Sequence, residues 1–112
     1  MGFLDKIKKS IELKQNSPSE ESLHKTQKKI SKLEKELVTN PDNFSLLLDL
    51  YGCYVEISNT EKKIECLERL SDLKPNDSYP FQQLADIYNH ELNDEKQAQI
   101  YQNKANKING YF

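Results

Sequence analysis

Apolar residues recur at spacings of three and four along most of this chain, which places their side chains on one face of an α-helix. The first set runs from Leu23 to Val38, and four further sets follow after short polar breaks. No segment alternates apolar and polar residues for long enough to indicate a β-strand. The pattern therefore predicts an all-α protein, with helices over 20–39, 43–57, 60–73, 78–91 and 94–108 and a short helix over 3–14.

Residues that stop or cap helices lie at the breaks in this pattern. The segments 40–43 and 74–77 each combine a proline with asparagine or aspartate side chains that can cap the next helix. Gly110 follows the last apolar position, as a helix terminator does. Because only a few residues separate successive helices, neighbours are predicted to form antiparallel helical hairpins.

The chain matches itself at a shift of 34 residues. The matched pairs are Ile30 with Ile64, Leu33 with Leu67, Pro41 with Pro75, Leu50 with Leu84 and Tyr54 with Tyr88. A period of this length with two helices in each repeat indicates a stack of helical hairpins.

This repeat resembles the tetratricopeptide repeat (TPR) family over residues 23–110, for about two and a half repeats. The residues that carry the resemblance are Phe81, Leu84, Ala85 and Tyr88 on a first helix, and Ala98, Tyr101 and Ala105 on a second. The resemblance implies a short TPR-like solenoid. It departs from the family at Tyr51 and Lys63, where small residues are usual, so we expect the first full repeat to be the looser one.

The resemblance also implies a groove along the inner faces of the first helices, which in the family holds peptides or partner helices. The positions expected to line it are Leu48, Gly52, Val55, Tyr79, Gln82, Asp86, Asn89 and His90. These positions lack the basic residues with which some members hold chaperone tails. A mixed acidic and apolar groove suits a basic amphipathic helix better, while the plainer interpretation is that each is an ordinary solvated helix residue.

Composition limits what the chain can be. Its 112 residues suffice for one small domain, and an apolar content of 36% predicts a thin core. The 16 basic residues are balanced by 18 acidic ones, which argues against a nucleic-acid partner. No apolar run reaches the ~20 residues of a membrane-spanning helix, so we expect a cytoplasmic protein, with a membrane-peripheral location as the alternative.

The N-terminal residues form a separate amphipathic pattern. Its contact stripe is Phe3, Leu4, Ile7 and Ile11, flanked by lysines on a helix or tail over 1–14. A polar stretch over 15–22, with Pro18 and three serines, predicts a linker to the repeat domain over 23–112. Three interpretations stay open: contact with a partner or with a copy of the chain itself, contact with a membrane surface, and a loosely ordered tail.

Patterns that carry chemistry are weak in this sequence. His24 and His90 lack metal-ligand spacing, and Cys53 and Cys66 fit buried small hydrophobes better than a nucleophile or a metal pair. We therefore expect no catalytic activity, metal or cofactor. The sequence favours a protein–protein interaction adaptor that binds a helix or peptide; a self-assembling or membrane-peripheral scaffold that uses the N-terminal helix is the alternative.

Overall fold

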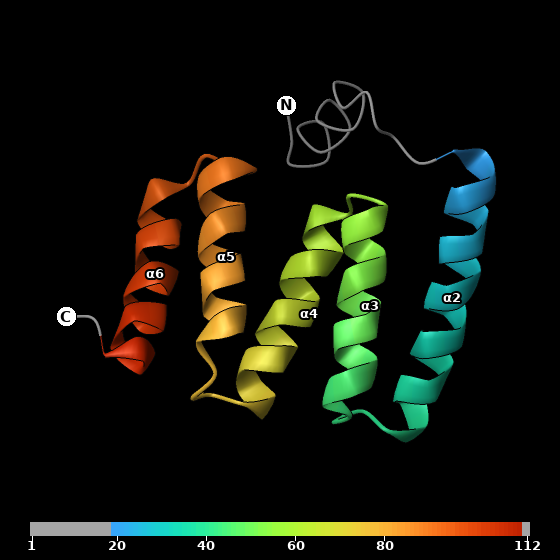
Figure 1. Ribbon diagram of the computed structural model, residues 1–112, viewed down its shortest axis with the longest axis horizontal. Helices are drawn as coiled ribbons and strands as arrows, with labels where there is room; N and C mark the ends of the chain where they lie inside the picture. Colours follow the sequence, from blue (N-terminus) through green and yellow to red (C-terminus); the bar gives the residue numbers. More distant parts are fainter. Residues whose placement is uncertain (1–18, 111–112) are drawn as a thin grey trace. The chain divides into compact units, whose positions relative to one another are not determined.

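A computed structural model describes residues 19–110, and every regular element in that range is an α-helix. The helices are α2 (Glu20–Thr39), α3 (Phe44–Glu56), α4 (Thr60–Leu73), α5 (Ser78–His90) and α6 (Glu95–Asn109) (Figure 1). The all-α prediction is confirmed, and each of these helices begins and ends within one residue of its predicted bounds. The predicted helix over 3–14 lies outside the described residues.

Side chains cap the helices at the breaks that the sequence marks. Asn43 accepts a hydrogen bond from the backbone N–H of Leu46 at 3.1 Å, and Asp94 accepts one from that of Gln97 at 3.1 Å. Each cap satisfies a backbone donor that has no partner within its helix. Gly110 ends α6 with a φ of 79°, a left-handed conformation that glycine adopts without strain.

The start of α2 agrees with the helix predicted over 20–39, which overlaps the last three residues of the polar stretch over 15–22. The hydroxyl of Ser19 accepts a hydrogen bond from the N–H of Ser22 at 3.2 Å, so the helix already begins at Glu20. Glu20 and Glu21 in the first turn also suit the positive end of the helix dipole. Residues 20–22 are therefore helical, because a serine cap and two acids outweigh the polar composition that suggested a linker.

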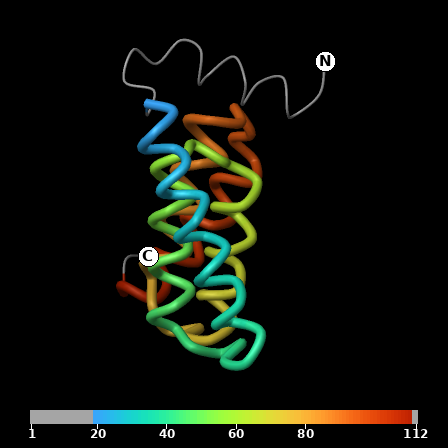
Figure 2. The backbone as a smooth tube through the Cα atoms, turned by 90° about the vertical axis from the view of Figure 1, so that its right-hand side faces the viewer, coloured from blue at the N-terminus to red at the C-terminus, as the bar shows by residue number. Residues whose placement is uncertain are grey.

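The chain divides into two compact units, and the boundary between them falls within α4, between residues 66 and 67. In the first unit α2 lies along α3, as Figures 1 and 2 show from two directions. The residues that α2 buries are Thr26, Ile30, Leu33 and Leu37, and those that α3 buries are Leu47, Leu50, Tyr51, Cys53 and Tyr54. Apolar faces of the predicted spacing thus form this core.

Tyr51 and Lys63, two large residues singled out in the sequence, are both buried. The exposed fraction of Tyr51 is 9%, and that of Lys63 is 8%. A lysine reaches such burial when its aliphatic stem lies along apolar neighbours. The first unit therefore buries a tyrosine and a lysine side chain beside its aliphatic residues.

In the second unit α5 and α6 form an antiparallel helical hairpin (Figure 1). Ala85, Ala98 and Ala105 are buried in this unit. Small buried side chains allow two helix backbones to approach closely, so the alanine positions singled out in the sequence are core positions here.

Candidate functional site

The eight predicted groove residues fall on two helices, three on α3 in the first unit and five on α5 in the second. The N-terminal contact stripe of Phe3, Leu4, Ile7 and Ile11 lies outside the described residues.

The three residues on α3 form an exposed apolar face that we call the α3 stripe: Leu48, Gly52 and Val55. Their spacing of four and three places them on one side of the helix. Leu48 is 38% exposed and Val55 is 46% exposed. Among the described residues, a Cβ atom added to Gly52 would meet nothing within 4 Å apart from its chain neighbours and its own helix backbone, so the glycine lies in open space between two exposed aliphatic side chains.

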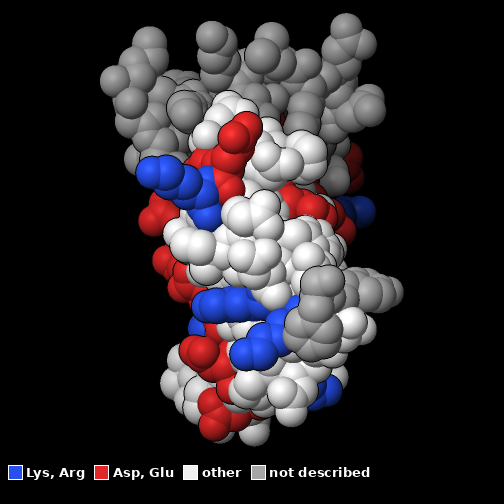
Figure 3. Space-filling model, turned by 90° about the vertical axis from the view of Figure 1, so that its left-hand side faces the viewer, with Lys and Arg blue, Asp and Glu red and all other residues white. Residues whose placement is uncertain are grey.

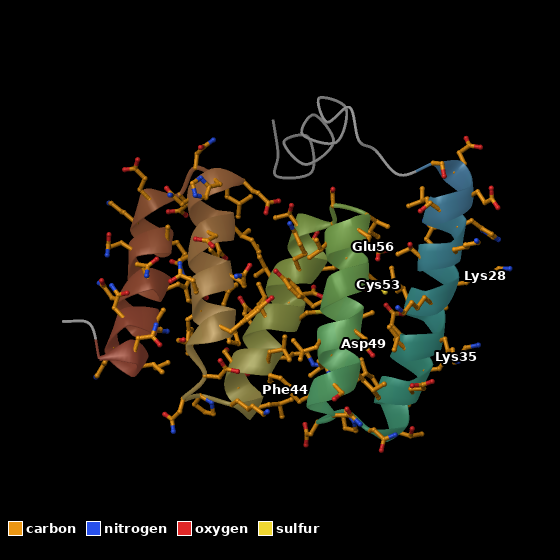
Figure 4. All side chains as sticks on the ribbon, in the orientation of Figure 1. Lys28, Lys35, Phe44, Asp49, Cys53 and Glu56 are labelled. Carbon is orange, nitrogen blue, oxygen red and sulfur yellow. The ribbon has the colours of Figure 1, made fainter. Side chains whose placement is uncertain are left out.

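Acidic residues flank the α3 stripe. Asp49 and Glu56 lie along the same helix, as Figure 4 shows, and both are exposed. Oε2 of Glu56 accepts a hydrogen bond from the Thr26 hydroxyl of α2 at 2.9 Å, which fixes that carboxylate beside the start of α2. Residues 44–56 contain no lysine or arginine. On α3 itself the stripe is therefore apolar, with two acidic side chains beside it, while the neighbouring helix α2 carries lysines such as Lys28 and Lys35.

Cys53 lies between these two acids along α3 but is buried and carries a free thiol. Burial raises its pKa, and the negative charges of Glu56 and Asp49 raise it further, while Lys29 opposes them. A thiol with a raised pKa stays protonated, and the thiolate is the form that reacts or binds metal. Cys53 thus behaves as a small core residue, in agreement with the prediction.

The five residues on α5 differ in exposure, and Nε2 of Gln82 donates a hydrogen bond to Oδ1 of Asp86 at 3.2 Å. Tyr79, Asp86, Asn89 and His90 are exposed, whereas Gln82 is half-buried and already paired. Nε2 of Gln82 donates to Oε1 of Gln102 at 2.9 Å, and Nε2 of Gln102 donates back to Oε1 of Gln82 at 2.9 Å. This reciprocal amide pair joins α5 to α6, so the Gln82 side chain stabilises the hairpin.

Asp86 and Asn89 line a pocket of about 270 Å³ between α5 and α6. Its other lining residues are Ala85, Glu95, Ala98, Gln99 and Gln102. Sequence reasoning missed the contribution of α6. The spacing of Glu95, Gln99 and Gln102 by four and three was the available signal, since it predicts one polar face on that helix.

Charged side chains are mixed rather than segregated on the face shown in Figure 3, where basic and acidic groups alternate with uncharged areas. Within residues 19–110 no group of three or more His, Cys, Asp or Glu residues could hold a metal ion. None of the helices described here is long and apolar enough to cross a membrane.

No family model, curated protein or solved structure matches the chain. The geometry of the described residues therefore carries the functional argument.

Proposed function

We propose that this protein is a non-catalytic adaptor that binds a basic amphipathic helix of another protein, with the α3 stripe as its apolar contact surface. The observation that carries the proposal is the open position of Gly52 between the exposed side chains of Leu48 and Val55.

A glycine inside a helix lowers stability by about 1 kcal/mol relative to alanine. Packing within the described chain does not require it at position 52, because an added Cβ would touch nothing. A missing side chain between two exposed aliphatic ones does, however, allow the backbone of a docked partner to approach closely. The cost in stability is then offset in the complex.

Charge indicates the chemistry of the partner. The exposed acids of the two candidate helices are Asp49, Glu56 and Asp86, and neither 44–56 nor 78–90 contains a lysine or arginine. Opposite charge at the rim of an interface raises association rates and selects partners. A partner helix with one apolar face and lysines or arginines beside it fits both the apolar stripe and the exposed acids. The TPR-like arrangement of hairpins remains part of this proposal, since a repeat stack presents such helices side by side.

Binding of a designed 18-residue helix of leucine and lysine, measured by calorimetry, tests the proposal. Val55→Asn replaces an apolar side chain of the α3 stripe with a polar one without adding charge, and it should weaken binding at least about tenfold, the usual effect of losing an interface contact worth 1.4 kcal/mol. Val38→Asn is the matched control, because Val38 is 81% exposed on α2 and lies outside the stripe. Equal effects of the two variants would reject the stripe as the contact surface.

The second candidate is a scaffold in which residues 1–14 of this chain or of a second copy occupy the α3 stripe. The hydrogen bond between Thr26 and Glu56 favours it, since it joins the beginning of α2 to the end of α3. The first turns of α2 therefore lie beside the last turn of α3. A 14-residue helix is about 21 Å long, close to the ~20 Å of a 13-residue helix such as α3.

Light scattering and vesicle binding of the full chain separate these alternatives. If the N-terminal stripe joins two copies, Ile7→Glu should convert a dimer into a monomer. If the N-terminal contact stripe binds a membrane, Ile7→Glu should abolish binding to anionic phosphatidylserine vesicles. A wild-type chain that is monomeric and does not bind vesicles would exclude both the second-copy and the membrane form of the scaffold.

A further inference from the structure

A second pocket, of about 430 Å³, lies in the second unit between the end of α4, the start of α5 and the last turns of α6. Its lining residues are Glu68, Ser71, Asp72, Pro75, Phe81, Tyr101 and Lys104. We call it the aromatic–acidic pocket. It shares no residue with the α3 stripe or with the pocket lined by Asp86, so the proposed function does not account for it.

Stacked rings form one wall of the pocket. Phe81 and Tyr101 lie with ring centroids 6.4 Å apart and planes inclined by 23°. Tyr88 stacks on Tyr101 at 5.6 Å and 19°. Since each ring is held by its neighbour, the Phe81 and Tyr101 side chains present a pre-organised aromatic surface to the pocket.

This aromatic surface already attracts a cation of the chain itself. Nζ of Lys104 lies 5.4 Å from the ring centroid of Tyr101 and 5.7 Å from that of Phe81. Both distances are within the ~6 Å over which an ammonium is attracted to a ring face. The Lys104 side chain is exposed and flexible, so it can leave the rings at little cost.

Two carboxylates complete the pocket. Glu68 and Asp72 are one helical turn apart on α4, both are exposed, and both line it. The charge of Glu68 reaches the rings: burial raises the pKa of Tyr88, and Tyr101, Glu68 and Asp94 raise it further. With two acids and one lysine the lining keeps a net negative charge, even while Lys104 is in place.

We propose that the aromatic–acidic pocket binds the arginine side chain of a partner peptide, whose guanidinium replaces the Lys104 ammonium over Phe81 and Tyr101 and pairs with Glu68 or Asp72. Arginine fits better than lysine because its planar group stacks on a ring face while its N–H donors reach a carboxylate. Lys104 then acts as a resident competitor that keeps the pocket filled when no partner is bound.

Titration of the full chain with three blocked tripeptides, followed by amide and side-chain NMR shifts, tests this proposal. The peptides contain arginine, lysine or citrulline between two glycines; citrulline has the shape of arginine without its charge. We expect the arginine peptide to bind most tightly and to shift the signals of Tyr101, Phe81 and Lys104. Binding of the citrulline peptide as strongly as the arginine peptide, or shifts confined to other residues, would overturn the proposal.

Variants of exposed residues sharpen the test, because they should fold normally. Lys104→Met removes the competitor and should raise the affinity for the arginine peptide about threefold, the scale of one exposed cation–π contact. Lys107→Met is the control on the same helix and should leave it unchanged, since Lys107 does not line the pocket. Combined Glu68→Gln and Asp72→Asn should weaken binding at least about fivefold. An affinity that falls in Lys104→Met, or that is unaffected by the loss of both acids, would contradict the assignment.

Discussion

Hydrogen bonds between single side chains tie each helical hairpin together. The phenol of Tyr54 donates to Oε1 of Glu34 at 2.8 Å and so joins α3 to α2, as the Gln82–Gln102 pair joins α5 to α6. Among residues 19–110 every buried side-chain nitrogen or oxygen has a hydrogen-bond partner. Unpaired polar groups would cost stability in so thin a core, so such pairs add to the stability that the apolar contacts provide.

Substitution by alanine should change the free energy of unfolding in opposite directions at Gly52 and at Gly110. Gly52→Ala should raise the free energy of unfolding by about 0.5–1 kcal/mol, because alanine favours the helix and its Cβ meets no atom. Gly110→Ala should lower it by about 1–2 kcal/mol, because its φ of 79° is strained for alanine. Urea denaturation measures both. A destabilising Gly52→Ala would mean that the free protein, and not a partner, requires the glycine.

The raised pKa of Tyr54 predicts that the fold loses stability at alkaline pH. Burial and the hydrogen bond to Glu34 hold its pKa well above the ordinary value of 10.0. A group whose folded-state pKa is raised contributes stability below its unfolded pKa and loses it as the pH rises further.

We therefore expect the free energy of unfolding to fall from about pH 10 upward, by at most about 1.4 kcal/mol per pH unit for one group. Tyr54→Phe should reduce this slope, as measured by urea denaturation across that range. Tyr79→Phe, which alters an exposed ring, is the control. The same slope in both variants would show that Tyr54 is not linked to stability.

At the scale of helices, local sequence accounts for nearly every boundary. A capping side chain precedes each described helix, and a proline lies in the breaks before α3 and α5. These signals act through bonds within three residues, so they do not depend on the rest of the fold. The predicted start of α2 at residue 20 is confirmed, because a serine cap and two acids begin a helix even within a polar stretch.

The cap of α3 supplies a prediction at this scale. Asn43→Ala should lower the free energy of unfolding by about 1 kcal/mol, because it leaves the N–H of Leu46 without its partner. Asp42→Ala changes an exposed neighbour in the same turn and should have an effect within about 0.5 kcal/mol. Urea denaturation followed by circular dichroism measures both. If the two variants were equally stable, the cap of Asn43 would not stabilise α3.

At the scale of the molecule, few side chains within residues 19–110 are fully buried, among them Leu47 in the first unit and Leu84 in the second. This agrees with the thin core expected from the low apolar content. Each unit buries its own set of leucines and small residues. Stability should therefore depend strongly on single leucines.

Two adjacent leucines test this dependence. Leu47→Ala should lower the free energy of unfolding by about 2–5 kcal/mol, because Leu47 has no exposed surface and leaves a cavity. Leu48→Ala, at the neighbouring position of the α3 stripe, should change it by about 1 kcal/mol or less. Thermal and urea unfolding measure both. Similar losses in the two variants would mean that Leu48 belongs to the core rather than to a binding surface.

Sequence by itself determined the all-α class, the bounds of five helices within residues 19–110 and most of the buried positions. It could do so because helical periodicity, caps and terminating glycine act over a few neighbouring residues. It also marked Leu48, Gly52 and Val55 as residues of one helix face, since their spacing alone defines that face.

Only the tertiary structure decided which residues of different helices meet. It pairs Gln82 with Gln102, and it places Lys104 over Phe81 and Tyr101. Spacing along one helix does not specify the rotation or the crossing angle of its neighbour, and those two quantities decide such contacts. For the same reason the aromatic–acidic pocket could not be found from the sequence, although each of its residues can be read there.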